Sequence, residues 1–207
     1  MTRIKLCGLS RPADIEAANK LKPEYIGFVF APKSRRYVAP EQAARLKRLL
    51  APEIKAVGVF VRDRPETIAG LVDSGIIDLV QLHGNETEEY VRRLRALVRV
   101  PVIKAFCMDT PRDAAEAQRS AADYILLDSG SGGMGRPFDW KLVRGVQRPY
   151  FLAGGLDAEN VAAAVRALNP YGVDVSSGIE AGGWKDRAKM TAFVHAVRNR
   201  ERKDDDQ

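Results

Sequence analysis

The chain has 207 residues, of which 45% are hydrophobic and 29% are charged. This length and composition are typical of a soluble globular protein that can bury a full core without disulfide or metal staples. Lys and Arg outnumber Asp and Glu, which gives a formal net charge of +6 at pH 7. Such a charge fits nucleic acid, an anionic small molecule or a merely basic surface, so composition leaves the binding partner open.

Two cysteines, Cys7 and Cys107, are too few for a disulfide framework or a four-cysteine zinc site. The chain reaches Lys5 and Gly8 before an apolar stretch develops, which is unlike a secretion signal. No apolar run approaches the ~18–20 residues that a membrane span requires. We therefore expect a cytoplasmic protein with no membrane association.

Short apolar segments rich in β-branched residues recur along the chain, and each is followed by an amphipathic stretch. Their starts lie roughly 22 to 30 residues apart, which is the length that a strand, a helix and two short loops require. In chain order, the predicted strands cover residues 3–8, 25–30, 55–61, 79–84, 102–106, 124–129, 150–156 and 172–178.

Helix-start signals lie between these strands. Ser10 precedes a stretch with acids in its first turns, Pro40 precedes Glu41, and Asp157 has the residue type of an N-cap. Alternating strands and helices predict a parallel sheet. Eight units favour a single α/β domain with the (β/α)8 TIM barrel fold, whose smallest members have ~200 residues.

We expect the barrel to occupy residues 1–200 and a solvated C-terminal tail to occupy residues 201–207. A nucleic-acid-binding arm is the alternative for the basic segment that ends the chain. Three consecutive aspartates near its end argue against that alternative.

Small residues end the last two predicted strands. Gly154 and Gly155 follow the seventh strand, and Ser176, Ser177 and Gly178 follow the eighth. Phosphate binds where backbone N–H groups converge, and barrels of this kind commonly hold one after strands seven and eight. Either cluster alone could be ordinary turn glycines and capping serines, but together they predict a phosphate site.

Cys7 ends the first predicted strand, and side-chain alternation places it on the same face as Lys5, opposite Ile4 and Leu6. The apolar pair then faces the helices, while Lys5 and Cys7 point into the barrel. A nearby ammonium would lower the thiol pKa and favour a cysteine base or nucleophile. A buried structural cysteine is the alternative, and the residues alone leave both open.

Asp128 ends the sixth predicted strand and precedes a glycine-rich loop, a position suited to a general acid at the barrel mouth. Its alternative role is a helix N-cap. The next helical pattern begins only near residues 138–140, where Asp139 is the better cap.

Arg35 and Arg36 follow the second predicted strand, and one of them could bind a substrate carboxylate, although a solvated basic loop is equally compatible. His83 could border the site or hold neighbouring groups, and without a second histidine nearby no metal site is expected. Cys107 is interpreted as a structural cysteine.

Motifs along the whole chain form a recognisable set. They are Lys5-Leu-Cys-Gly-Leu, Gly27-Phe-Val-Phe, Ser34-Arg-Arg-Tyr-Val, Val57-Gly-Val-Phe-Val, Val80-Gln-Leu-His-Gly-Asn-Glu, Leu127-Asp-Ser, Leu152-Ala-Gly-Gly-Leu and Val173-Asp-Val-Ser-Ser-Gly-Ile-Glu. In this order they closely resemble the phosphoribosylanthranilate isomerase family of tryptophan biosynthesis. The resemblance implies a cofactor-free Amadori rearrangement of N-(5-phosphoribosyl)anthranilate.

The resemblance also assigns roles to particular residues. Cys7 matches the family's base, Asp128 its acid, Arg36 its carboxylate-binding arginine and Asp174 the aspartate near the anthranilate amine. Its phosphate loops match Gly154, Gly155, Ser176, Ser177 and Gly178. We further expect Lys5 and His83 to contribute to substrate binding.

The expected partner is a small molecule that carries both phosphate and carboxylate, with no nucleic acid and no cofactor, and the chain is expected to be a monomer or homodimer. One alternative is a bifunctional sugar isomerase that also accepts a histidine-pathway substrate, but such enzymes have an aspartate where this chain has Cys7. The other is a non-catalytic sugar-phosphate binder, against which the presence of both Cys7 and Asp128 argues.

Overall fold

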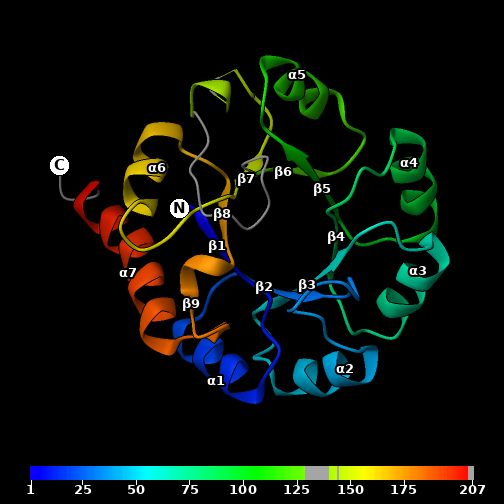
Figure 1. The fold of residues 1–207 in the computed structure, drawn as a ribbon, viewed down its shortest axis with the longest axis horizontal. Helices are drawn as coiled ribbons and strands as arrows, with labels where there is room; N and C mark the ends of the chain where they lie inside the picture. Colours follow the sequence, from blue (N-terminus) through cyan, green and yellow to red (C-terminus); the bar gives the residue numbers. More distant parts are fainter. Residues whose placement is uncertain (129–139, 144, 205–207) are drawn as a thin grey trace.

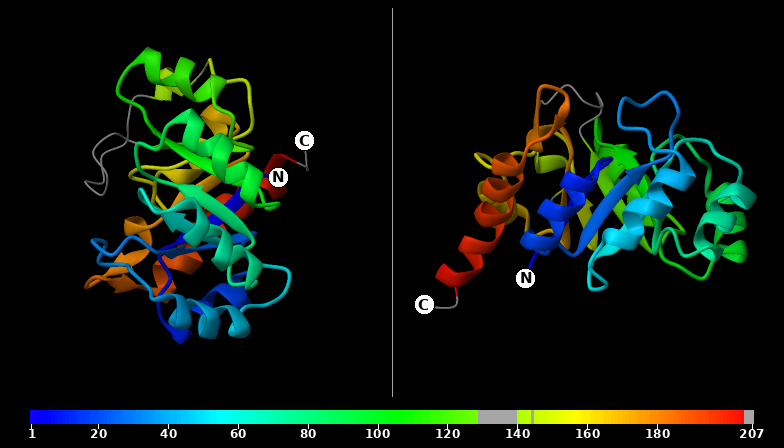
Figure 2. Two further views of the ribbon diagram at one scale, coloured as in Figure 1. Left: turned by 90° about the vertical axis from the view of Figure 1, so that its right-hand side faces the viewer. Right: turned by 90° about the horizontal axis from the view of Figure 1, so that it is seen from below.

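A closed barrel of eight parallel strands forms the centre of the protein, and helices surround it (Figures 1 and 2). The structure is a computed structural model, and it describes residues 1–128, 140–143 and 145–204. Each strand pairs with the next along the chain, and β8 pairs with β1 to close the sheet. The predicted (β/α)8 TIM barrel is therefore confirmed.

All eight predicted strand starts are observed. The strands are β1 (Arg3–Cys7), β2 (Tyr25–Val29), β3 (Lys55–Phe60), β4 (Leu79–Leu82), β5 (Val102–Cys107), β6 (Tyr124–Asp128), β7 (Tyr150–Leu152) and β8 (Gly172–Val175). The last two predicted strands extend too far, because β7 ends at Leu152 rather than residue 156 and β8 ends at Val175 rather than residue 178. Gly154 and Gly155 have φ angles of 83° and 64°, which leave the extended region, so the chain turns away soon after β7.

Helices follow most of the strands. They are α1 (Pro12–Leu21), α2 (Pro40–Leu49), α3 (Pro65–Asp73), α4 (Glu88–Leu97), α5 (Pro111–Arg119), α6 (Val161–Leu168) and α7 (Arg187–Asp204). Short 3-10 helices occupy Trp140–Val143 (η1) and Ser177–Ile179 (η2), and β9 (Glu180–Ala181) pairs with β10 (Trp184–Lys185). Proline begins α1, α2, α3 and α5, where its missing N–H costs no helical hydrogen bond.

Two predicted helix starts were wrong by a few residues. The first helix begins at Pro12 rather than Ser10, because the Asp14 carboxylate accepts the backbone N–H groups of Ser10 and Arg11 at 3.0 Å and caps the helix from inside. The sixth begins at Val161, because Asp157 instead accepts the N–H groups of the turn that precedes it.

Helix α7 packs against both α1 and α6 and so completes the ring of helices. It continues to Asp204, within the segment predicted as a tail. Among the described helices, none combines the length and the apolarity that crossing a membrane requires.

Two apolar layers stabilise the barrel. Ile4 and Leu6 of β1 belong to the large core between sheet and helices, as the alternation predicts. A second core lies inside the barrel around the fully buried Phe151. The Phe151 ring makes edge contacts with Tyr25, Tyr124 and Tyr171 at centroid distances of 5.6, 6.0 and 5.3 Å.

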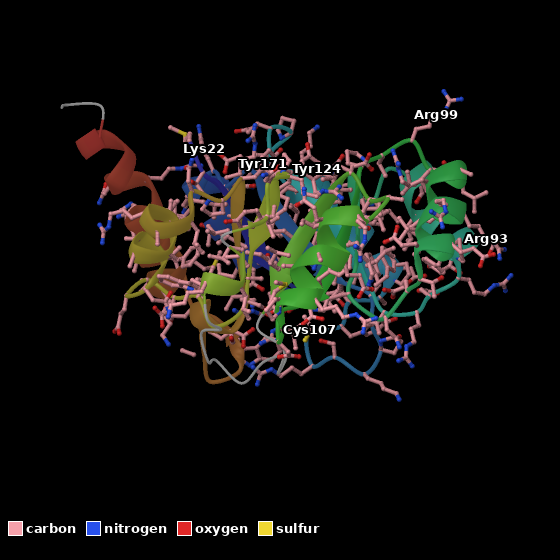
Figure 3. All side chains as sticks on the ribbon, turned by 90° about the horizontal axis from the view of Figure 1, so that it is seen from above. Lys22, Arg93, Arg99, Cys107, Tyr124 and Tyr171 are labelled. Atoms are coloured by element: carbon pink, nitrogen blue, oxygen red, sulfur yellow. The ribbon has the colours of Figure 1, made fainter. Side chains whose placement is uncertain are left out.

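The tyrosines mark the end of the barrel where the strands begin. Figure 3 shows Tyr124 and Tyr171 on the opposite side of the molecule from Cys107, which ends β5. A Cβ at Gly172 would lie 2.7 Å from the Phe151 ring, so a glycine is needed beside it. Phe151 and the three tyrosines form an aromatic plug that fills this end of the barrel. The cavity described below therefore lies at the other end.

We predict that Phe151→Ala lowers the free energy of unfolding by about 3–5 kcal/mol, because it removes a fully buried ring that packs against three tyrosines and leaves a cavity in its place. Urea unfolding followed by circular dichroism measures the change. The exposed Leu97 at the end of α4 supplies the control, and Leu97→Ala should change the same quantity by less than about 0.5 kcal/mol. Equal effects of the two substitutions would show that burial of Phe151 in the aromatic plug does not stabilise the fold.

Candidate active site

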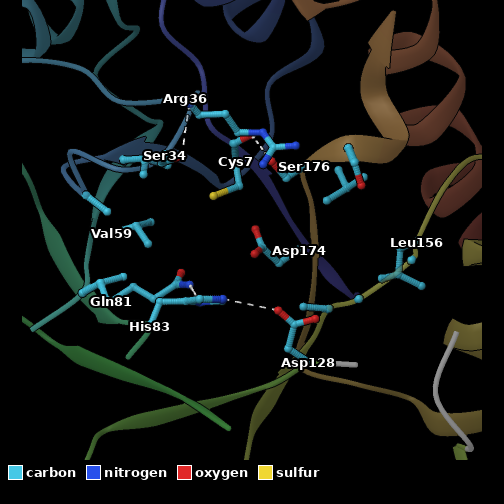
Figure 4. Close-up of a pocket in the computed structure, with 18 residues that line it drawn as sticks. Cys7, Ser34, Arg36, Val59, Gln81, His83, Asp128, Leu156, Asp174 and Ser176 are labelled. Carbon is cyan, nitrogen blue, oxygen red and sulfur yellow. Dashed lines mark hydrogen bonds and ion pairs between the residues drawn. The ribbon is translucent and has the colours of Figure 1, made fainter. Parts of the chain in front are cut away.

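A cavity of about 330 Å³ opens at the carboxyl ends of the strands. Its wall contains most of the predicted site residues: Cys7, Arg36, His83, Asp128, Gly154, Gly155, Asp174, Ser176 and Ser177. Figure 4 shows Cys7 and Arg36 on one side, His83 and Asp128 on the other, and Asp174 between them. Parallel strands in a closed barrel explain the gathering, because they bring these distant segments to one end.

Lys5 and Gly178 are not among the residues that line the cavity. Lys5 is fully buried, and its Nζ donates to Oδ1 of Asp174 at 2.8 Å. The two residues are direct neighbours in the β1–β8 register. Burial alone favours the neutral amine, but the Asp174 carboxylate and Cys7 hold the pKa of Lys5 above its ordinary value. Lys5 therefore acts on the cavity through Asp174.

Cys7 points into the barrel as predicted and is 7% exposed. Its pKa, however, was predicted in the wrong direction. Burial raises the pKa of the thiol above its ordinary value, and the opposing effect of Lys5 does not overcome it. The charge of Lys5 is already paired with Asp174, whose own charge also disfavours the thiolate. Burial therefore favours the neutral thiol over the thiolate.

Asp128 contacts the ring of His83 on one side of the cavity. Oδ2 of Asp128 lies 3.3 Å from Nε2 of His83, and Nδ1 of His83 lies 2.9 Å from Nε2 of Gln81. Gln81 is 1% exposed and lines the same cavity. The sequence analysis did not select Gln81. Its position two residues before His83 in an apolar strand was the available signal, because alternation puts both residues on one face.

Glu180 is a second residue that the sequence analysis missed. Its carboxylate accepts from Nε and Nη2 of Arg36 at 2.6 and 3.0 Å, from Nη2 of Arg35 at 2.8 Å and from Nζ of Lys185 at 2.6 Å. Burial opposes its charge, but these cations overcome the penalty and lower the pKa of Glu180 to about 2. Glu180 therefore orients both arginines of the loop after β2.

The loops after β7 and β8 pack tightly against each other. A Cβ at Gly178 would lie 2.0 Å from the carbonyl oxygen of Leu156, so only glycine fits this position. Lys185 fixes the second loop, since its Nζ donates to the backbone oxygen of Ser176 at 2.9 Å and to the Ser176 hydroxyl at 3.2 Å. Small residues thus bring backbone from both loops to one side of the cavity.

Several features predicted from the sequence are not part of the cavity wall that the structure describes. The glycine-rich loop after Asp128 and the predicted cap Asp139 lie outside the described residues. Cys107, which was predicted to be structural, is exposed at the end of β5 and lies outside the cavity wall. Within residues 1–128, 140–143 and 145–204, no group of three or more His, Cys, Asp and Glu side chains could hold a metal ion.

The family model for N-(5'-phosphoribosyl)anthranilate (PRA) isomerase matches residues 4–196. The chain belongs to this family. The N-(5'-phosphoribosyl)anthranilate isomerase of Endomicrobium trichonymphae is 43% identical over 203 residues, a match that covers 96% of this chain and 100% of the relative.

Solved structures agree with this assignment. The phosphoribosyl anthranilate isomerase from Thermotoga maritima superposes with a TM-score of 0.89 at 38% identity, over 96% of this chain and 100% of the other. A phosphoribosyl anthranilate isomerase in complex with reduced 1-(o-carboxyphenylamino)-1-deoxyribulose 5-phosphate has a TM-score of 0.86 at 37% identity, over 96% and 100% of the chains. That relative holds a ligand with both a phosphate and a carboxylate.

We predict that Glu180 makes folding depend on pH in the acid range. A pKa lowered from 4.5 to about 2 stabilises the folded state above the unfolded value, and this stability is lost as pH falls toward 2. The loss amounts to about 3 kcal/mol between about pH 5 and pH 2. Urea unfolding across this range measures it.

Glu180→Gln should unfold more easily at neutral pH and show a shallower pH dependence of stability below about pH 5. The control is Glu159→Gln, which removes an exposed carboxylate and should keep the slope of the unsubstituted chain. An unchanged slope in Glu180→Gln would show that the arginine and lysine contacts do not stabilise the fold.

Proposed function

We propose that the chain catalyses the Amadori rearrangement of N-(5-phosphoribosyl)anthranilate to 1-(2-carboxyphenylamino)-1-deoxyribulose 5-phosphate, a step of tryptophan biosynthesis. One observation carries this proposal: a thiol and a carboxyl group face one cavity whose walls also present arginine and glycine-rich backbone to an anionic ligand. Membership in the isomerase family supports the same substrate.

The reaction needs an acid and a base. Protonation of the furanose ring oxygen opens the ring to an iminium ion, and removal of the proton at C2 of the sugar then gives an enolamine that rearranges to the ketone. Both steps are proton transfers, so the proposed chemistry requires no cofactor. Asp128 and Cys7 lie on different sides of the cavity, which suits two transfers at different atoms of one substrate.

Asp128 is the proposed acid. Its side chain is partly buried at the end of β6, with Oδ2 beside His83, and its other oxygen is proposed to protonate the ring oxygen of the sugar. Cys7 is the proposed base. Its raised pKa makes the thiolate rare in the free protein, but a thiolate formed there is a stronger base than an exposed one.

The remaining polar residues are proposed to bind the substrate. Arg36 of the cavity wall shares one carboxylate, Glu180, with Arg35 and Lys185 behind it, so this side of the cavity keeps a net positive charge for an anion. Arg36 is proposed to bind the anthranilate carboxylate, and His83 to border the sugar.

Asp174, held by Lys5, is proposed to face the anthranilate amine. The phosphate is assigned to Gly154, Gly155, Ser176, Ser177 and Gly178, where backbone from two loops converges.

We predict that Asp128→Asn and Cys7→Ser each lower kcat by at least about 100-fold while leaving the affinity for a product analogue within a few-fold. Each substitution keeps the shape of the side chain and removes its proton-transfer chemistry. Steady-state kinetics and calorimetric titration measure the two quantities. Near-normal kcat in either variant would remove that residue from its proposed role, and lost affinity would make it a binding residue instead.

A further inference from the structure

Gln81 is a buried amide in the wall of the cavity. It is 1% exposed on β4, and its Nε2 lies 2.9 Å from Nδ1 of His83. Its Oε1 is the only buried side-chain oxygen or nitrogen among the described residues that has no hydrogen-bond partner within the protein. A buried amide with one end hydrogen-bonded and the other end unpaired does not stabilise the fold. A functional role would explain why the side chain keeps this orientation.

In this orientation the amide nitrogen lies toward the ring, and it determines which ring nitrogen carries the proton. An amide nitrogen only donates, so Nδ1 of His83 has to present its lone pair to Gln81. The proton of the neutral ring then lies on Nε2, which is the atom 3.3 Å from Oδ2 of Asp128. An imidazolium donates from both nitrogens and would place an N–H group against the N–H group of Gln81.

We propose that Gln81 is a positioning residue that keeps His83 neutral, with its proton on Nε2, and thereby keeps the acidic proton of the site on Asp128. This inference rests on the proposed role of Asp128 as the acid. A histidine able to take up a second proton would form an imidazolium–carboxylate pair with Asp128. In that pair Asp128 is ionised and has no proton to give to the substrate.

The charged groups around His83 do not by themselves keep its ring neutral, so the proposal assigns this effect to Gln81. Among the described residues, Asp128 on β6 is the ionisable group whose side chain lies against the ring, and a carboxylate beside an imidazole generally attracts a second proton to it. Cys7, Asp174 and Arg36 face it from other parts of the same cavity. In the loop after β4, Glu86 accepts from Nζ of Lys104 at 3.0 Å and from the N–H of Gly84, so that carboxylate is already engaged. The Gln81 amide opposes the tendency of the Asp128 carboxylate to draw a second proton onto the His83 ring.

The free Oε1 links this arrangement to ligand binding. A hydroxyl or amine group of a ligand in the cavity would satisfy this acceptor, and the satisfied amide could not rotate without losing two hydrogen bonds. Bound substrate would therefore hold the amide in the orientation that keeps His83 neutral.

The direct test is nitrogen NMR of the full-length, ligand-free chain with labelled histidine. The chain has two histidines, and the exposed His195 on α7 serves as an internal reference. At neutral pH, the unsubstituted chain should show His83 neutral with its proton on Nε2. A ring protonated on Nδ1, or on both nitrogens, would overturn the proposal without any variant.

Gln81→Glu supplies the variant test, because an oxygen at this position accepts from Nδ1–H and favours the imidazolium. At neutral pH His83 should become doubly protonated, and kcat should fall at least about tenfold while KM changes less than about threefold. Gln147→Glu, at an exposed position between η1 and β7, adds the same charge and should change neither the spectrum nor kcat. An unchanged His83 spectrum in Gln81→Glu would overturn the proposal.

Gln81→Met covers the case in which a buried glutamate prevents folding. It keeps the length of the side chain but removes the donor, so the preference for a proton on Nε2 should weaken and kcat should fall. A spectrum and kcat equal to those of the unsubstituted chain would overturn the proposal. The NMR spectra do not depend on catalysis. They therefore test the role of Gln81 even if the Asp128→Asn kinetics show that Asp128 is not the acid.

Discussion

Closure of the parallel sheet by β1 and β8 is the constraint on which the site depends. The pairing sets Lys5 beside Asp174, and the buried ion pair between them joins the first strand to the last at 2.8 Å. Because all eight strands run in the same direction around the barrel, Cys7, Asp128 and Asp174 end at the same mouth although they lie far apart in the sequence. The aromatic plug around Phe151 fills the opposite end, so the available space lies where the polar strand ends converge.

Charges around the cavity are paired before any ligand arrives. Lys5 is held by Asp174, and Glu180 gathers Arg35, Arg36 and Lys185. This pairing explains why Lys5 does not activate Cys7: its charge is balanced locally, so burial controls the thiol pKa. It also restrains Arg36 of the cavity wall, which is held by Glu180 and so loses less side-chain freedom when an anion binds.

Local patterns predicted the fold well because they depend on neighbouring residues. The starts of all eight strands and the inward direction of Cys7 follow from apolar runs and side-chain alternation. The misses have long-range causes. The direction of the Cys7 pKa depends on burial by several strands, and Glu180 matters through arginines from the loop after β2. Gln81 was missed because its partner ring and its buried, unpaired oxygen appear only once the barrel closes.

Turnover by the purified chain is the decisive measurement of the proposed isomerase activity. N-(5-phosphoribosyl)anthranilate is generated in place from anthranilate and phosphoribosyl pyrophosphate by the preceding transferase, and its fluorescence is followed after this chain is added. A cavity that unites the proposed acid, the proposed base and the proposed anion-binding loops predicts a saturable loss of fluorescence whose rate is proportional to the amount of chain. Decay no faster than that of the substrate alone would rule out the proposed isomerase activity.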